Sequence, residues 1–253
     1  MGEDGKTTVR AVERALDLLL CFTVRDEWAM TELAEKVGLH KSTVHRMLAT
    51  LEEKGFVTRD RFSERYRLGL RIWELSASMS GADDPAVLAL PEMERLRDTL
   101  GETVSLYIRD GAERIRIQAV QSNQAVRRVA PVGARLPLYV GASSKVLIAF
   151  EEQAVQAELL ARLLAEESWP DTIDPAFFRE QLADIRRVGF ATSFEERESG
   201  AAAVAAPVFS RSSHKLMAAL SVSGPANRLT SEVMREHVPA IMESARRLST
   251  MFR

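Results

Sequence analysis

The side chains best suited to bind another molecule cluster around residue 43. Short hydrogen-bonding groups and cations open a predicted helix there: His40, Lys41, Ser42, Thr43, His45 and Arg46. Such side chains at a helix N-terminus can reach base edges and phosphates in the major groove of double-stranded DNA. We therefore expect five of them to contact DNA: Lys41, Ser42, Thr43, His45 and Arg46.

The residues just before this helix predict a helix-turn-helix. That motif needs a small residue where its two helices cross and a glycine four residues later to permit the turn, and Ala34 and Gly38 have this spacing. We expect Thr31 to cap the first helix, which ends at Gly38, and the second to open near Ser42. Apolar residues at helical intervals supply the buried positions: Leu33, Val37, Leu39, Val44 and Met47.

A basic hairpin is predicted after the second helix. Residues 56–58 and 66–68 read as short strands around a polar tip that carries Arg59, Arg61 and Arg65. We expect these arginines on the DNA backbone or in the minor groove. From Gly38 to Arg71, eight Lys and Arg face four Asp and Glu, a net charge of +4 that leaves −6 for the rest of the chain. This asymmetry favours a small DNA-binding module on a larger domain, although a solvated charged face has the same local composition.

Other chemistries find weaker support. Ser143, Ser144 and Lys145 suggest a serine–lysine hydrolase, but no Gly-x-Ser-x-Gly elbow accompanies them. His40 and His45 have no acidic residue placed to complete a metal site. Cys21, the single cysteine, lies in an apolar helix and is expected to be a packed core residue. We expect no enzyme activity, no cofactor and no metal.

The remaining segments must position these groups, and they predict an α+β protein. Residues 1–68 are the predicted DNA-binding domain, residues 69–84 a linker helix and turn, and residues 85–253 a second domain. Asp84 and Pro85 open the next helix as N-cap and first helical residue. Strands are expected at 102–109, 114–121, 126–132, 190–194, 202–209 and 216–223, and helices at 9–22, 85–100, 143–152, 154–165, 175–187 and 231–252.

The composition sets the protein class. Of 253 residues, 46% are hydrophobic and 28% are charged, which is ordinary for a globular protein and excludes a disordered chain, a collagen-like repeat and a coiled-coil rod. No apolar run approaches the roughly 20 residues that span a bilayer, and residues 1–10 do not resemble a signal peptide. We therefore expect a cytoplasmic protein without a membrane partner.

At this level of detail a family resemblance is apparent. VRAVERALDLLLCF, TELAEKVGLHKSTVHRMLATLEEKGFV and YRLGLRIWEL resemble the N-terminal winged helix of the IclR family of bacterial transcriptional regulators. GETVSLYIRDG, APVGARLPLYVGASSKVLIAF, RRVGFATSFEERESGAAAVAAPVF and AALSVSGPANRLT resemble its effector-binding domain. The resemblance implies a GAF/profilin-like second domain with an antiparallel sheet, a small-molecule effector, a dimer or dimer of dimers, and control of a metabolic operon.

The resemblance also indicates an effector pocket. It places Ala142 and Ser143 at a helix N-terminus whose free N–H groups favour a carboxylate, and Ser221 on a strand that faces the ligand. Ser193 and Ala203 stand where some members that bind small acids have Asp and Cys, which favours a larger or more apolar acid, such as an aromatic acid. Leu106 and Phe194 are further expected contacts for the body of this acid.

Two classes of function follow. The first is a ligand-responsive repressor that reads a pseudo-palindromic operator. The second is an effector-binding or hydrolase-like module whose N-terminal domain docks protein rather than DNA.

Overall fold

The computed structural model describes residues 8–79, 84–125, 131–165, 169–170 and 173–253. The chain divides into two compact units, Met1–Gly81 and Ala82–Arg253. The division lies inside the segment 69–84 that was expected to link two domains. Part of that segment, residues 80–83, lies outside the described residues.

The first unit packs three helices against a small hairpin. Its elements are α1 (Arg10–Cys21), α2 (Met30–Val37), α3 (Lys41–Glu53), β1 (Val57–Arg59), β2 (Tyr66–Leu68) and α4 (Leu70–Met79). Leu18, Leu33, Val44 and Leu48 form the centre of its core with no exposed surface. Cys21 belongs to this core, as expected, and burial raises the pKa of its thiol.

The turn between α2 and α3 has the predicted geometry. Ala34 is buried beside α3, and Gly38 adopts a left-handed φ of 64° at the end of α2. The expected cap at Thr31 is wrong, because α2 begins one residue earlier, at Met30. Ala29 precedes it, and the Ala29 N–H donates to the Glu32 carboxylate at 2.8 Å. At the start of α3, the Ser42 N–H donates to Nδ1 of His40 at 3.3 Å.

The second unit is built on a six-stranded antiparallel sheet. The strands are β3 (Thr103–Asp110), β4 (Glu113–Val120), β5 (Arg135–Pro137), β6 (Ala191–Phe194), β7 (Ala201–Phe209) and β8 (Leu216–Pro225), in the order β5-β4-β3-β8-β7-β6. The helices are α5 (Pro85–Leu100), α6 (Ala142–Ala149), α7 (Gln153–Ala165), α8 (Pro175–Val188) and α9 (Ser231–Met251). As expected, Asp84 caps α5 through the Ala86 N–H.

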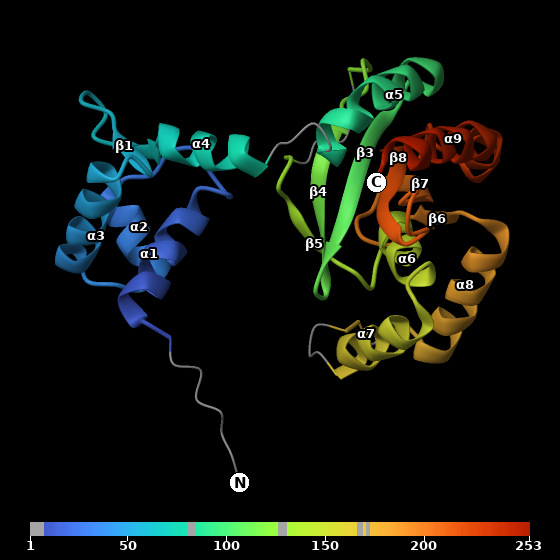
Figure 1. Cartoon of the computed structure of the whole chain (residues 1–253), viewed down its shortest axis with the longest axis horizontal. Helices are drawn as coiled ribbons and strands as arrows, with labels where there is room; N and C mark the ends of the chain where they lie inside the picture. Colours follow the sequence, from blue (N-terminus) through green and yellow to red (C-terminus); the bar gives the residue numbers. More distant parts are fainter. Residues whose placement is uncertain (1–7, 80–83, 126–130, 166–168, 171–172) are drawn as a thin grey trace, which may run out of the picture. The chain divides into compact units, whose positions relative to one another are not determined.

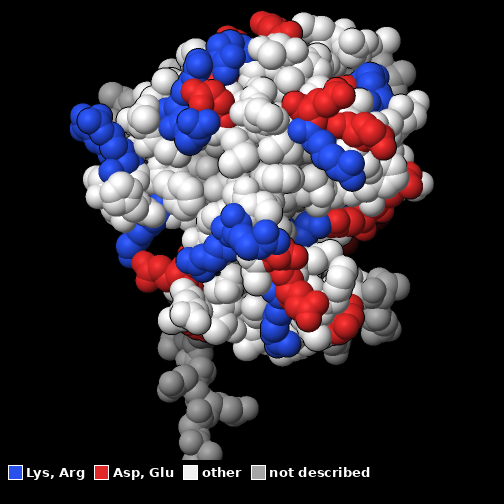
Figure 2. Space-filling model, turned by 90° about the vertical axis from the view of Figure 1, so that its right-hand side faces the viewer, with Lys and Arg blue, Asp and Glu red and all other residues white. Residues whose placement is uncertain are grey.

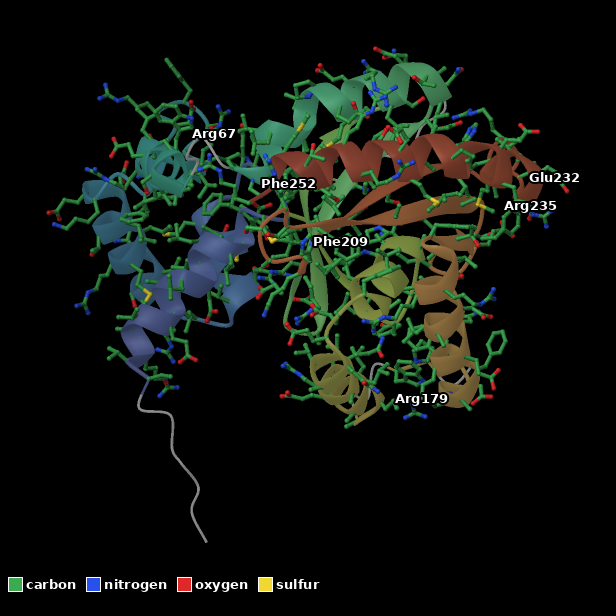
Figure 3. The ribbon with its side chains drawn as sticks, turned by 45° about the vertical axis from the view of Figure 1, so that its right-hand side comes forward. Arg67, Arg179, Phe209, Glu232, Arg235 and Phe252 are labelled. Carbon is green, nitrogen blue, oxygen red and sulfur yellow. The ribbon has the colours of Figure 1, made fainter. Side chains whose placement is uncertain are left out.

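Helices cover both faces of this sheet (Figure 1). One face packs against α5 and α9 and forms the larger core, to which Met93, Leu220 and Leu248 belong. The other face packs against α6, and α7 and α8 pack against α6 in turn. The end of α9 is fastened to the end of β7, where Figure 3 labels Phe252 and Phe209: the Phe209 N–H donates to Ser249 Oγ at 2.9 Å and the Arg211 N–H donates to the Phe252 carbonyl at 2.7 Å.

Two expected elements of the second unit differ in the structure. One of the two edge strands, β5, was not predicted, and residues 126–130 of the strand expected at 126–132 lie outside the described residues. The helix α6 ends at Ala149, three residues before the predicted end. Among the described residues, no helix has both the length and the apolar character needed to cross a membrane.

Gly69 permits a close backbone approach between the hairpin and α3. The Gly69 N–H donates to the Phe56 carbonyl at 2.8 Å. Two residues later, the Arg71 N–H donates to the Gly55 carbonyl at 3.1 Å. A Cβ at position 69 would overlap the Gly55 carbonyl oxygen and lie 2.8 Å from its carbon. Because both atoms belong to the backbone, the clash cannot be relieved by a side-chain rotation.

We expect Gly69→Ala to destabilise the first unit by about 2–3 kcal/mol, in the range of other steric insertions into packed sites. Urea unfolding followed by tryptophan fluorescence measures this, since Trp28 is buried in the first unit. Gly38→Asn is the control, because Asn tolerates a left-handed φ and nothing lies within 4 Å of a Cβ there. Equal stability of the two variants would contradict the steric account.

Candidate functional site

One face of α3 is polar and open to solvent. Lys41, Ser42, His45 and Arg46 are exposed, while Val44 and Leu48 on the other side of the helix are fully buried. The four exposed residues follow the spacing i, i+1, i+4, i+5, which places them on one side of a helix. Within the described residues neither Lys41 nor Arg46 forms an ion pair.

Thr43 differs from its four neighbours. Its side chain is half-buried and lines a shallow groove with Ala11 and Ala15 of α1, which Arg46 also borders. The expected recognition surface therefore gathers Lys41, Ser42, His45 and Arg46, with Thr43 at its edge.

The hairpin tip is a tight, preformed turn. The Asp60 carboxylate accepts hydrogen bonds from the Ser63 N–H at 2.7 Å, the Ser63 hydroxyl and the Phe62 N–H, and these bonds hold the pKa of Asp60 below its ordinary value. The turn presents Phe62 with 98% of its surface exposed. Sequence analysis did not single out Phe62, although an aromatic residue in a polar turn was a usable signal.

The three arginines of the hairpin have different surroundings. Arg61 forms no ion pair with any described residue. Arg59 pairs with Glu64 at 2.9 Å within the turn. Arg65 pairs with Glu32 of α2 at 3.2 Å, so it ties the hairpin to the helix-turn-helix. Of the three, Arg61 is the most available to an external phosphate.

The second unit contains a cavity of about 350 Å³ between the sheet and the N-terminus of α6. Five of the seven residues expected in an effector pocket line it: Ala142, Ser143, Ser193, Ala203 and Ser221. They come from α6, β6, β7 and β8, so the fold joins segments that are far apart in the sequence. The lining also includes six further charged or polar residues: Tyr107, Arg114, Arg116, Arg197, Glu198 and Ser223.

Leu106 and Phe194, which were also expected to contact the effector, do not line this cavity. Successive residues of a strand face opposite sides of the sheet. Leu106 is fully buried in the core under α5 and α9, whereas its neighbour Tyr107 faces the cavity. Phe194 is 47% exposed, and the residue before it, Ser193, is the one that lines the cavity.

Two buried arginines of β4 are the main feature that sequence analysis missed. Arg114 and Arg116 are 4% and 5% exposed. Arg114 donates through Nη1 to the Val140 carbonyl at 2.8 Å and to Ser144 Oγ, and its Nε has no partner among the described residues. Arg116 donates to the Tyr107 hydroxyl from Nε at 3.0 Å and from Nη2 at 2.6 Å.

The charge of Arg114 is strongly desolvated. Burial lowers the pKa of its guanidinium to about 10, and the positive charges of Arg197 and Arg116 act in the same direction. The group nevertheless remains a cation at neutral pH.

On the face shown in Figure 2, Lys and Arg side chains alternate with Asp and Glu around a band of uncharged ones. Positive side chains therefore predominate among the described residues of the cavity lining, whereas the surface in Figure 2 carries charges of both signs.

The N-terminus of α6 already holds one internal carboxylate. Glu196, from the loop after β6, accepts from the Gly141 N–H at 3.1 Å and pairs with Lys145 Nζ at 2.5 Å. The Lys145 side chain is thus directed to Glu196, and no hydrogen bond among the described residues joins it to Ser143, which weakens the hydrolase interpretation. Among the described residues, no group of three or more His, Cys, Asp and Glu is placed to hold a metal ion.

Comparisons with known proteins agree on one family. The IclR helix-turn-helix domain matches residues 11–61, and the C-terminal domain of the bacterial transcriptional regulator IclR matches residues 84–250. The regulator BhcR of Paracoccus denitrificans is 30% identical over 98% of this chain and 89% of its own length. The transcriptional repressor IclR of Escherichia coli is 28% identical over 96% of this chain and 90% of its own.

Solved structures extend the likeness to the fold. IclR of Thermotoga maritima superposes with a TM-score of 0.75 at 29% identity, over 95% of this chain and 98% of that one. An IclR homologue from Microbacterium hydrocarbonoxydans, complexed with 4-hydroxybenzoate, superposes with a TM-score of 0.76 at 28% identity, over 94% and 99% of the two chains.

We expect Glu196→Gln to lower the free energy of unfolding of the second unit by roughly 1–3 kcal/mol, because it leaves the buried Lys145 ammonium without its counter-ion. Denaturant unfolding of the unliganded protein measures this change. Glu198→Gln is the matched control in the same loop, since Glu198 is exposed and its ion pair with Arg197 is long, at 3.6 Å. Equal stability of both variants would show that the Glu196 pair is not structural.

Proposed function

The chain belongs to the IclR family of bacterial transcriptional regulators, and we propose that it represses a metabolic operon until an organic acid fills the cavity of its C-terminal unit. It is a DNA-binding transcriptional regulator with a helix-turn-helix, and its family consists of regulators rather than enzymes. The observation that carries the proposal is the polar cavity with buried cations in the unit that does not carry the helix-turn-helix.

The proposed DNA contact uses α3 in the major groove. Support comes from the exposed face formed by Lys41, Ser42, His45 and Arg46 at the beginning of the helix. The hairpin then follows the backbone or enters the minor groove through Arg61, and Phe62 at its tip offers an apolar contact with a sugar or a base step. The roles of Arg59 and Arg65 are secondary in this proposal, because both already pair within the unit.

The direction of control follows the named functions of relatives. Two of them are a transcriptional repressor and an acetate operon repressor. The complex of a homologue with 4-hydroxybenzoate supports an organic acid as effector. Such an acid changes operator affinity only if it prefers one arrangement of the DNA-binding units, and a coupling of about 1–3 kcal/mol is sufficient for regulation.

The proposed regulator is a homodimer, or a dimer of dimers, on a pseudo-palindromic operator. An apolar stripe on α1 supports this, because Val12, Leu16 and Leu20 are each more than half exposed at helical spacing. The helix α4 exposes Trp73 and Leu70 by 70% and 79%. Apolar surface of this extent on a small unit indicates a partner, and a two-fold dimer presents two copies of α3 to two half-sites.

We expect Arg46→Ala to weaken binding to the protein's own upstream DNA by roughly 1–3 kcal/mol if Arg46 reads a base. A mobility-shift titration at fixed salt concentration measures this. Arg187→Ala is the charge-matched control, because Arg187 is an exposed residue of α8 in the other unit. Unchanged affinity of Arg46→Ala would remove Arg46 from the interface. If the parent shows no sequence preference at all, the N-terminal unit docks something other than an operator.

We expect Trp73→Glu, combined with Leu16→Glu, to yield a monomer at micromolar concentration and to weaken operator binding at least ~tenfold, because one half-site then binds without the other. Light scattering measures the mass, and a mobility shift measures the affinity. Phe177→Glu is the control, since it replaces an apolar residue of α8 that is 57% exposed. A parent that is monomeric yet binds the operator tightly would overturn the dimer.

A further inference from the structure

The cavity in the second unit contains a buried cation, Arg114, that forms no ion pair with a described residue. The Glu196 carboxylate acts on it only from a distance, and its guanidinium donates to the Val140 carbonyl and to Ser144 Oγ. Its Nε has less than 1 Å² of exposed surface and no hydrogen-bond partner in the part of the chain that the structure describes. Burying an ion in this way is unfavourable unless an opposite charge lies close to it. An anion in the cavity would supply that charge.

A second buried cation lies next to the first. Arg116 is on the same side of β4, two residues along, so the Cα atoms of the two arginines are about 6.6 Å apart. Both side chains line the cavity, and each contacts or approaches the Tyr107 ring. The Tyr107 hydroxyl accepts from Arg116 and fixes the direction of its guanidinium. The two positive centres are therefore held at a defined separation.

Among the described residues, the charged side chains that line the cavity are those of Arg114, Arg116, Arg197 and Glu198, three cations and one acid. The nearby Lys145 and Glu196 neutralise each other in an ion pair. A ligand with two negative charges would balance this set, whereas a monoanion would leave one positive charge in excess.

The rest of the lining is polar and small. Ser193, Ser221 and Ser223 project from β6 and β8, and the first N–H groups of α6, those of Ala142 and Ser143, border the same space. These groups suit carboxylate and hydroxyl oxygens better than an aromatic ring. Ser193 and Ala203 by themselves favour a more apolar effector, but the two buried arginines beside them favour a more highly charged one.

We infer that the effector of this regulator is a compact dicarboxylate, with one carboxylate at Arg114 and the N-terminus of α6 and the other at Arg116. The inference rests on the proposed function, since it names the class of acid that acts on the proposed pocket. Ser193 and Ser221 then hydrogen-bond to hydroxyl or keto groups on the carbon chain between the two carboxylates.

A matched ligand series tests the number of charges. Succinate and malate are titrated into the full-length protein at neutral pH, where both of their carboxylates are ionised, beside butyrate and 4-hydroxybenzoate as monocarboxylates. Calorimetry and thermal unfolding report binding. We expect the better of the two dicarboxylates to bind at least ~tenfold more tightly than butyrate, because charge-assisted hydrogen bonds form at both ends.

Three variants test the location. Arg114→Met is expected to abolish dicarboxylate binding. It should not lower the unfolding temperature of the unliganded protein, because an apolar side chain of similar shape replaces a desolvated charge. Ala203→Glu places a carboxylate in the cavity and is expected to abolish binding through a different residue. Arg179→Met is the control at an exposed position of α8 on the side of α7 (Figure 3), and it should bind as the parent does.

The outcomes separate this inference from the proposed function. Equal affinity for butyrate and succinate, retained dicarboxylate binding in both cavity variants, or no saturable dicarboxylate binding would each overturn the dicarboxylate. If Arg114→Met fails to fold, Ala203→Glu decides the location. A mobility shift on the same samples tests the regulator: operator binding that 4-hydroxybenzoate alone releases leaves the proposed function intact while the dicarboxylate fails. Loss of sequence-specific DNA binding in the parent contradicts the proposed function whichever acid binds.

Discussion

The antiparallel sheet of the second unit has helices on both faces, and the alternation of its side chains governs everything else in that unit. On one face, residues such as Val204, Leu220 and Val222 form a continuous apolar core with α5 and α9. On the other face, the same strands carry Ala203, Ser221 and Ser223. These side chains are too short to fill the space below α6, so the cavity follows from the choice of small residues on one face of two central strands.

The polar groups of the cavity are in turn oriented by the elements around it. Arg114 reaches the carbonyl at the end of the segment before α6, and Tyr107 holds Arg116. Glu196 caps Gly141 and neutralises Lys145 from a loop between two strands. Each cation that the fold buries is thus positioned by a neutral acceptor or an acid from a different element. This arrangement fixes the site before any ligand is bound, which reduces the conformational cost of binding.

Much of this architecture was predictable from the sequence, and the failures have physical causes. The spacing of Ala34 and Gly38 located the helix-turn-helix, and the resemblance located five cavity residues correctly. Leu106 failed because a shift of one residue along a strand moves a side chain to the other face. Arg114 and Arg116 were missed because the alternation of Arg and Ile in β4 is typical of a half-exposed strand. The two arginines are buried because β4 pairs with β3 on one side and β5 on the other, and because the segment before α6 covers the face that carries them.

The alternation in β7 has a consequence for how such a regulator can diversify. Ala202, Val204 and Ala206 belong to the core under α5 and α9, whereas Ala203 lies on the other face, where it lines the cavity and borders the smaller core around α6. A substitution at Ala203, or at Ser193 and Ser221 on the neighbouring strands, changes what the cavity accepts while the opposite face keeps its packing. Ligand preference and the packing under α5 and α9 therefore depend on different faces of the same strands. A single substitution on the cavity face can change the ligand that fits while the core under α5 and α9 stays in place.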